Sequence, residues 1–281
     1  MFLDYNDVCR ALGEDEFFPF FQPLVELSSR QLTGFEALAR WNHARLGAIS
    51  PDAFISIVQK SGLINTLTRK LLEKTFAAAP LLSGSLRLSI NLSPLQLVDE
   101  MLPGQIAAVA RLGGFPLERL TIEMTQSALI DDLPNAQAVA GQIKAMHCRL
   151  ALDNFGTGHS SLFHLQALPF DELKIDRSFV HAITQNRDSR KIVAALVGLA
   201  KSMELITVAE GVETEEQAGV MYELGCDLAQ GWLFGKPASA EEIPRMVSEA
   251  SGICPSFSPV LAEEDPMAAT RGRTQTAYSA S

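Results

Sequence analysis

Short apolar runs recur along the chain, and stretches with a helical pattern lie between most of them. Eight runs rich in β-branched or aromatic residues predict strands; they cover residues 17–25, 32–41, 86–93, 120–125, 149–155, 172–176, 205–211 and 228–234. After the second run, the intervening segments carry helix-start signals. Pro51 follows Ser50, and capping-box patterns occupy residues 93–96, 214–217 and 239–242.

Repeated alternation of strands and helices favours a parallel sheet, and eight strands favour closure into a barrel. The stretch from Glu26 to Gly34 between the first two runs is too short for a parallel crossover, which needs about a dozen residues. The first strand should therefore run antiparallel to the second. The predicted fold is α/β, a modified TIM-like (β/α)8 barrel; an open doubly wound sheet is the alternative.

The pattern also predicts the domain boundaries. Residues 1–16 are expected to form a lead-in helix and residues 17–250 the barrel domain. Residues 251–281 are rich in Ser, Pro, Ala and Thr without apolar periodicity, which predicts a flexible tail. Without the tail, the length matches the usual size of one α/β barrel.

Composition narrows the classes of protein. Apolar residues make up 47% of the 281 positions and charged residues 20%, which excludes disorder of the whole chain. A formal charge of −10 argues against DNA or RNA polymers and anionic membranes as partners. No apolar run reaches the ~18–20 residues of a membrane span. The scattered cysteines Cys9, Cys148, Cys226 and Cys254 indicate free thiols, so we expect a cytoplasmic protein.

Ionisable and amide side chains lie at the ends of the predicted strands, where α/β barrels build their sites. They are Glu36, Asn91, Glu123, Asp153, Asn154, Lys174, Asp176, Glu210, Glu213 and Gln230. Carboxylates that converge on one mouth repel each other, which predicts a divalent cation between them. Oxygen ligands indicate Mg²⁺, Mn²⁺ or Ca²⁺ rather than zinc.

Two reaction classes fit this set of residues. A metal-activated water could hydrolyse a phosphoester while Lys174 holds the water or the phosphate. Alternatively, Lys174 could remove a proton next to a carboxylate while Mg²⁺ stabilises the enolate, as in enolase-type barrels. Spacing alone leaves both reactions open.

Seven motifs follow one another between Phe20 and Pro237: EALARW (36–41), SINLSP (89–94), TIEMTQS (121–127), LDNFGTGHSS (152–161), KIDRSFV (174–180), AEGVET (209–214) and QGWLFGKP (230–237). In these motifs the chain resembles the EAL family of cyclic di-GMP phosphodiesterases. The resemblance implies the modified barrel, cyclic di-GMP as ligand, Mg²⁺ or Mn²⁺ as cofactor and inhibition by Ca²⁺. The implied reaction opens one phosphodiester bond to give linear diguanylate. A homodimer is also implied.

The resemblance assigns roles to individual residues. The positions that match metal ligands are Glu36, Asn91, Glu123, Asp153, Asn154 and Glu210, with Asp153 shared between two metals. Lys174, Glu210 and Asp176 match the catalytic group, in which Lys174 positions and polarises the attacking water. The positions expected at the ligand are Gln22, Leu38, Arg40, Pro94, Glu213 and Gln230.

Two positions depart from the family pattern. Asn154 stands where the family has a second aspartate, and one unit charge pair at 4 Å is worth about 4 kcal/mol at an effective dielectric constant of 20. Glu210 and the substrate phosphate could compensate. Gln126 stands where active members carry a glutamate that anchors the loop 155–161; alternatively it caps the following helix.

These departures predict a domain that binds cyclic di-GMP with weak or absent hydrolysis. The alternatives are a fully competent phosphodiesterase, an inactive cyclic di-GMP receptor and a regulator that binds a protein partner.

Overall fold

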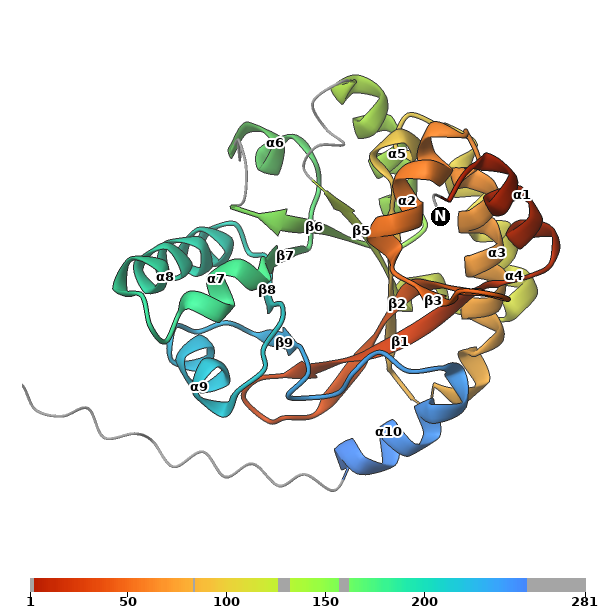
Figure 1. Ribbon diagram of the computed structural model, residues 1–281. Helices are drawn as coiled ribbons and strands as arrows, with labels where there is room; N and C mark the ends of the chain where they lie inside the picture. Colours follow the sequence, from red (N-terminus) through yellow and green to blue (C-terminus); the bar gives the residue numbers. More distant parts are fainter. Residues whose placement is uncertain (1–2, 83, 126–131, 157–161, 252–281) are drawn as a thin grey trace, which may run out of the picture.

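Eight strands close into a barrel in the computed structural model, which describes residues 3–82, 84–125, 132–156 and 162–251 (Figure 1). The described residues form β1 (Phe17–Glu26), β2 (Leu32–His43), β3 (Gly47–Ile49), β4 (Arg87–Leu92), β5 (Leu120–Thr125), β6 (Arg149–Phe155), β7 (Glu172–Ile175), β8 (Ile206–Ala209) and β9 (Leu228–Gln230), of which all but β3 belong to the ring. The order around the ring is β1-β9-β8-β7-β6-β5-β4-β2, and β1 pairs with β2 to close it. The barrel prediction is confirmed and the open-sheet alternative is wrong.

The first strand runs antiparallel to both of its neighbours, β2 and β9, whereas β2 and β4–β9 are parallel. A tight turn joins β1 to β2, in which Arg30 N donates to Glu26 O at 2.8 Å and Glu26 N donates to Gln31 O at 2.9 Å. The short connection therefore produced the predicted antiparallel strand. The small strand β3, which extends the sheet from the end of β2, was not predicted.

Helices surround the barrel and connect consecutive parallel strands (Figure 1). They are α1 (Tyr5–Gly13), α2 (Pro51–Lys60), α3 (Ile64–Ala77), α4 (Leu102–Gly113), α5 (Leu133–Ala145), α6 (Leu162–Ala167), α7 (Arg177–Ala182), α8 (Arg187–Ser202), α9 (Glu215–Glu223) and α10 (Ile243–Ser251). None of these helices is both long and apolar enough to cross a membrane.

The predicted helix starts are confirmed at three places and wrong at one. Pro51 is the first residue of α2, and the Thr214–Gln217 capping box begins α9. Ser239 is the N-cap of the 3-10 turn η5 (Ala240–Glu242), which continues directly into α10, although its side chain makes no capping hydrogen bond. At 93–96 the chain forms only the single 3-10 turn η2 (Pro94–Gln96), and the next helix, α4, begins at Leu102.

The core lies between the barrel and its helices. On one side, Val8 and Ala11 of α1 are fully buried in a cluster with Phe17, Trp41 and Phe54. The helix that the sequence places ahead of the barrel is therefore packed onto it. Cys9, Cys148 and Cys226 are free thiols, whereas Cys254 and residues 252–281 of the predicted tail lie outside the described residues.

Candidate functional site

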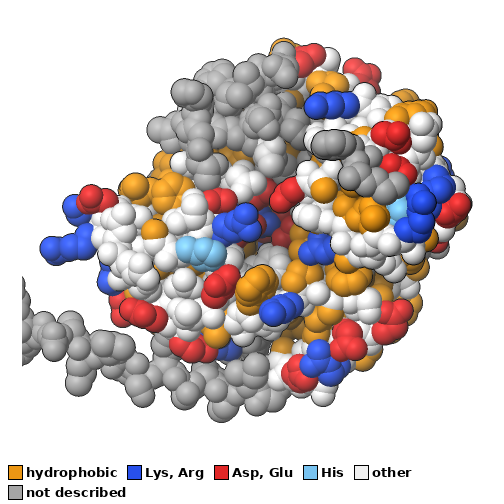
Figure 2. Space-filling view, viewed as in Figure 1, with side chains coloured by type: hydrophobic (Ala, Val, Ile, Leu, Met, Phe, Trp, Pro, Cys, Tyr) orange, Lys and Arg blue, Asp and Glu red, His pale blue; other side chains and the backbone are white. Residues whose placement is uncertain are grey.

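The polar side chains predicted at the strand ends are brought together by the register of the barrel. Gln22 on β1 lies opposite Glu36 on β2. On the neighbouring parallel strands, Asn91 pairs with Glu123. Because side chains alternate between the two faces of a strand, residues two apart face the same side, and the candidate residues recur with that spacing. Acidic side chains, with Lys and Arg side chains beside them, line the hollow in the middle of the face in Figure 2.

Lys174 lies at the point where the carboxylates converge. Its Nζ is 2.5 Å from Glu123 Oε2, 2.8 Å from Glu210 Oε1 and 3.1 Å from Glu36 Oε2. The Lys174 side chain is only 2% exposed. An ammonium group this deep in a protein is tolerated because several carboxylates surround it.

Two amides fix the Glu36 carboxylate from the other side. Asn91 Nδ2 donates to Glu36 Oε1 at 2.6 Å, and Gln230 Nε2 donates to Glu36 Oε2 at 2.8 Å. Gln230 Nε2 also donates to Gln22 Oε1, and Gln22 Nε2 in turn donates to the backbone oxygen of Gly235. Gln22, Asn91 and Gln230 therefore lie at the cluster, as the sequence predicts.

The pKa values of the acids in the cluster are shifted in different directions by burial, by mutual repulsion and by hydrogen bonds. Burial raises the pKa of Glu123 well above its usual range, and the charge on Glu36 adds to this. Burial, with the charges of Asp153 and Glu36, raises the pKa of Glu210 to about 8. Burial also raises the pKa of Asp153. For Glu36, Lys174 and the two amides outweigh burial and lower the pKa.

Lys174 keeps its charge in this setting. Burial opposes the charge, but the carboxylates of Glu123, Glu210, Glu36 and Asp153 raise the pKa of Lys174 well above its usual value. Four carboxyl groups therefore lie near a single ammonium. Because their negative charges exceed its positive charge, the pKa values of Glu123, Asp153 and Glu210 are raised.

Asp153 and Asn154 lie near the end of β6, where the backbone has an unusual local conformation. Asn154 has a φ of +56°, a left-handed conformation that asparagine tolerates better than most residues. Its backbone N donates to Asp153 Oδ1 at 2.7 Å, and its Nδ2 donates to Asp153 Oδ2 at 3.0 Å. An aspartate at position 154 could not make the second bond, because a carboxylate has no donor.

The donor set of the cluster fits a hard divalent cation. Carboxylate and amide oxygens are the ligands that Mg²⁺, Mn²⁺ and Ca²⁺ prefer, and the excess negative charge would be neutralised by such an ion. Within the described residues, however, no three Asp, Glu, His or Cys side chains are arranged around a common metal position. Glu36, Glu123 and Glu210 are all paired with the Lys174 ammonium in this structure.

Two predicted site residues lie apart from the cluster. Asp176 caps α7, where its side chain accepts a hydrogen bond from Ser178 N at 2.8 Å. Glu213 is 41% exposed, and its Oε1 lies 3.6 Å from His181 Nε2. Gln126 lies outside the described residues, and so does the side chain of Pro94, whose backbone forms η2.

Leu38 and Arg40 line a cavity of about 480 Å³ that reaches Asn91 and the ends of β4 and β5. The Arg40 guanidinium lies over the Phe20 ring at 5.8 Å, and burial lowers its pKa. Gln59, Ser93 and Thr125 also line this cavity and were missed from the sequence. Ser93 and Thr125 stand two residues beyond Asn91 and Glu123, a spacing that could have pointed to them.

Comparison with known proteins identifies relatives of the whole barrel. The sequence profile described as EAL domain matches residues 6–237. The chain is 35% identical to the cyclic di-GMP phosphodiesterase RocR of Pseudomonas aeruginosa over 234 residues, which are 82% of this chain. It is 39% identical over 238 residues, 85% of its length, to a signalling protein of Caulobacter vibrioides.

A solved structure has the same fold. The c-di-GMP complex of the PaMucR phosphodiesterase matches with a TM-score of 0.79 and 33% identity, over 85% of this chain and 98% of that one. The chain spans 60% of RocR and 29% of the Caulobacter protein. RocR and the Caulobacter protein are thus similar to this chain over only part of their length.

Proposed function

The chain belongs to the EAL domain family, and we propose that it binds cyclic di-GMP at the mouth formed by the carboxyl ends of the parallel strands and hydrolyses it slowly. The observation that carries the proposal is the buried cluster of Glu36, Glu123, Asp153 and Glu210 around Lys174. RocR is named a cyclic di-GMP phosphodiesterase, and PaMucR was solved in complex with c-di-GMP. This favours the phosphodiester reaction over the enolase-type alternative.

Two divalent ions, Mg²⁺ or Mn²⁺, are part of the proposal. Glu36, Asn91, Glu123 and Asp153 would hold the first ion, and Asp153, Asn154 and Glu210 the second. When bound, such ions lower the pKa of a water and neutralise charge that develops on the phosphoryl group. Ca²⁺ is expected to support binding of the nucleotide and to inhibit its hydrolysis.

The chain's own residues bind the nucleotide and orient the reacting water. Arg40 offers a guanidinium that matches a phosphate oxygen pair, at the polar edge of a cavity otherwise rich in aliphatic side chains. Lys174 would donate to the water that attacks phosphorus through an N–H released by one of its three carboxylate partners, and Asp176 caps α7. One water adds across one phosphorus–oxygen bond, which leaves a linear dinucleotide with a free hydroxyl and a terminal phosphate.

Asn154 is the reason for the proposed slow rate. Its amide brings no negative charge, and its Nδ2 donates a hydrogen bond to Asp153, a residue that would also have to hold the second ion. The same contact favours the second candidate, a receptor that binds cyclic di-GMP without turnover.

The test compares turnover of cyclic di-GMP by the wild type and Asn154→Asp over a series of Mg²⁺ and Mn²⁺ concentrations. We expect a gain of at least tenfold and a lower metal requirement in the variant. Asn6→Asp, on the exposed first turn of α1, is the matched control for added charge. Equal and fast turnover by both proteins would refute the role of Asn154; binding in calorimetry with Ca²⁺ but no product in either protein would identify a receptor.

A further inference from the structure

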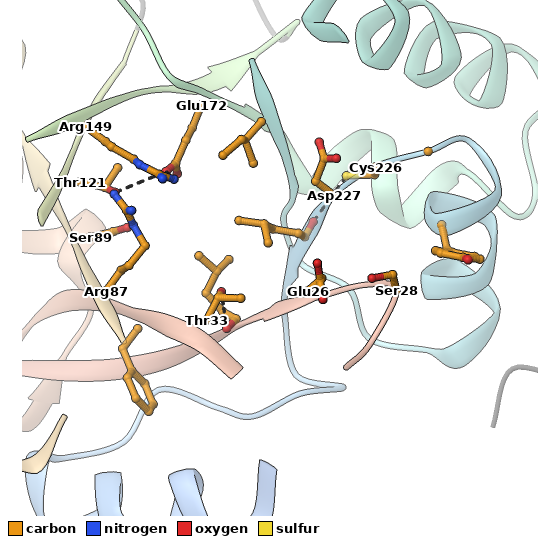
Figure 3. Close-up of a pocket in the computed structure, with 16 residues that line it drawn as sticks. Glu26, Ser28, Thr33, Arg87, Ser89, Thr121, Arg149, Glu172, Cys226 and Asp227 are labelled. Carbon is orange, nitrogen blue, oxygen red and sulfur yellow. Dashed lines mark hydrogen bonds and ion pairs between the residues drawn. The ribbon is translucent and has the colours of Figure 1, made fainter. Parts of the chain in front are cut away.

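Carboxylates outside the cluster differ in how they are held. In a cavity of about 500 Å³ at the other end of the barrel, Arg149 Nη1 lies 3.4 Å from Glu172 Oε1 (Figure 3). Asp227 in the same cavity accepts two hydrogen bonds from Thr207. These acids are engaged within the protein. Glu213, at the mouth of the barrel, is different, because its side chain is 41% exposed.

The loop of residues 210–213 follows the carboxyl end of β8 and lies beside the candidate site. Its first residue, Glu210, belongs to the carboxylate cluster. Farther along, Val212 N donates to Gln230 O at 3.0 Å. Because the Gln230 side chain is also part of the cluster, these contacts place the next residue, Glu213, at the rim of the same site.

Helix α7 contacts this loop through one histidine. His181 Nε2 lies 3.0 Å from Gly211 O and 3.6 Å from Glu213 Oε1. A carbonyl oxygen only accepts hydrogen bonds, so Nε2 carries a hydrogen and donates it to Gly211 O. Gly211 has a φ of +68°, and a Cβ added there would lie 2.6 Å from Arg177 Cβ. The loop and α7 are therefore in direct contact, with the His181 imidazole beside Glu213.

The two acids of the loop depend on His181 to different degrees. The Glu210 carboxylate pairs with Lys174 at 2.8 Å and needs no other cation. Glu213 N donates to Gln217 Oε1 at 2.8 Å, which fixes the backbone of Glu213 but not its side chain. Within the part of the chain that the structure describes, His181 is the only basic side chain within 4.0 Å of the Glu213 carboxylate. The direction of that carboxylate therefore depends on His181.

We propose that His181 is a positioning residue for Glu213, and that the pair raises the affinity of the site for the nucleotide. This inference rests on the proposed function and on the expected place of Glu213 at the ligand. A carboxylate only accepts hydrogen bonds and repels phosphate groups, so Glu213 would accept from an N–H or O–H of a base or ribose. The hydrogen on His181 Nε2 is present in this neutral tautomer and in the protonated imidazole. The arrangement therefore needs no change of charge on His181.

The test measures binding of cyclic di-GMP to the full chain by calorimetry in Ca²⁺. His181→Leu removes the donor and should weaken binding about fivefold. His181→Gln keeps an N–H donor and should restore affinity to within about twofold of the wild type. In the Glu213→Gln background, His181→Leu should cause no further loss, because the partner is already changed. In turnover with Mn²⁺, KM should rise in His181→Leu while kcat stays unchanged, because Glu210 keeps its own partner.

His147→Asn is the matched control and should bind like the wild type, because His147 is exposed and precedes β6 at the opposite end of the barrel. His181 is 45% exposed, so its variants should melt near the wild type; if His181→Leu does not fold, His181→Ser serves the same comparison.

The positioning role is overturned if His181→Leu binds as tightly as the wild type, if His181→Gln loses as much affinity as His181→Leu, or if the full loss persists in the Glu213→Gln background. A fall in kcat with unchanged KM also overturns it. All four outcomes leave the proposed function intact. A wild type that binds no cyclic di-GMP refutes the proposed function, and this inference with it.

Discussion

At the scale of single residues, Lys174 organises the candidate site. Three carboxylates bind its ammonium within 3.1 Å. Removing one partner of such a buried group leaves an uncompensated charge, which usually costs several kcal/mol. The acids of the cluster thus share one counterion, the Lys174 ammonium. Their protonation states should therefore change with pH as a coupled group.

The first prediction concerns Glu210, whose pKa is about 8 against an ordinary value of 4.5. Between these values the folded protein keeps a proton that the unfolded chain has released, so the metal-free protein should lose stability as pH rises through this window. The raised pKa values of Glu123 and Asp153 act in the same direction. Thermal unfolding in EDTA across the window measures this effect.

Glu210→Gln should flatten that pH dependence, because the variant has no proton to release at this position. Glu223→Gln, an exposed glutamate on α9, is the matched control and should follow the wild type. A melting temperature of the wild type that increases steadily from pH 4.5 to about 8 would contradict the raised pKa of Glu210.

The second prediction concerns Arg40. Hydrogen bonds to charged groups contribute about 1.5–3 kcal/mol, so Arg40→Gln should weaken binding of cyclic di-GMP by roughly ten- to hundredfold. Calorimetry in Ca²⁺ measures affinity without turnover. Arg69→Gln, on the exposed face of α3, should bind like the wild type. Unchanged affinity in Arg40→Gln would remove this arginine from the ligand site.

At the scale of elements, α1 is tied to the barrel by one polar network. Glu16 Oε2 accepts from Trp41 Nε1 at 2.8 Å, and Arg10 of α1 pairs with Glu16 Oε1 at 2.5 Å. The Arg10 guanidinium, with the Trp41 bond, lowers the pKa of Glu16 to about 2. The helix and the second strand are thereby joined through a single, nearly buried carboxylate.

Glu16→Gln should therefore destabilise the fold by about 1–3 kcal/mol at neutral pH. A lowered pKa stabilises the protein above the ordinary value of 4.5, and this contribution is lost as pH falls toward 2. Urea unfolding should show the difference between variant and wild type shrink in acid. Glu14→Gln removes the exposed partner of the same arginine and should cost much less; equal losses would mean that Glu16 contributes nothing beyond a surface pair.

The sequence predicted elements better than it predicted contacts. All eight barrel strands follow from apolar runs, and the antiparallel β1 follows from the length of one connection. The acids were expected to meet because strand ends converge. That Lys174 would hold three of them depends on side-chain directions across the barrel, which leave no periodic signal in the sequence.

At the scale of the whole molecule, closure of the barrel gathers acidic groups from separate strands at one end of the ring, at Glu36, Glu123 and Glu210. At the other end Arg87 and Arg149 lie beside Glu172, which pairs with Arg149. Part of the formal charge of −10 of the chain is therefore concentrated at the first end, where cations are expected to act.

A further prediction is that Mn²⁺ stabilises the folded molecule. A ligand that binds only the folded state at a hundred times its Kd adds about 2.7 kcal/mol. The increase in melting temperature should be larger near pH 8 than near pH 6, because Glu210 must release its proton to bind a metal. Sodium chloride at matched ionic strength is the control, and Glu36→Gln should lose most of the effect. Equal shifts with the sodium salt would contradict a specific site.

The ion pairs of Lys174 have a consequence for how the protein is made. Since an internal amine already stands among the acids, the chain should fold without waiting for a cation. Under the function proposed above, metal-free copies would be folded but inactive, and added manganese or magnesium would activate them without new synthesis.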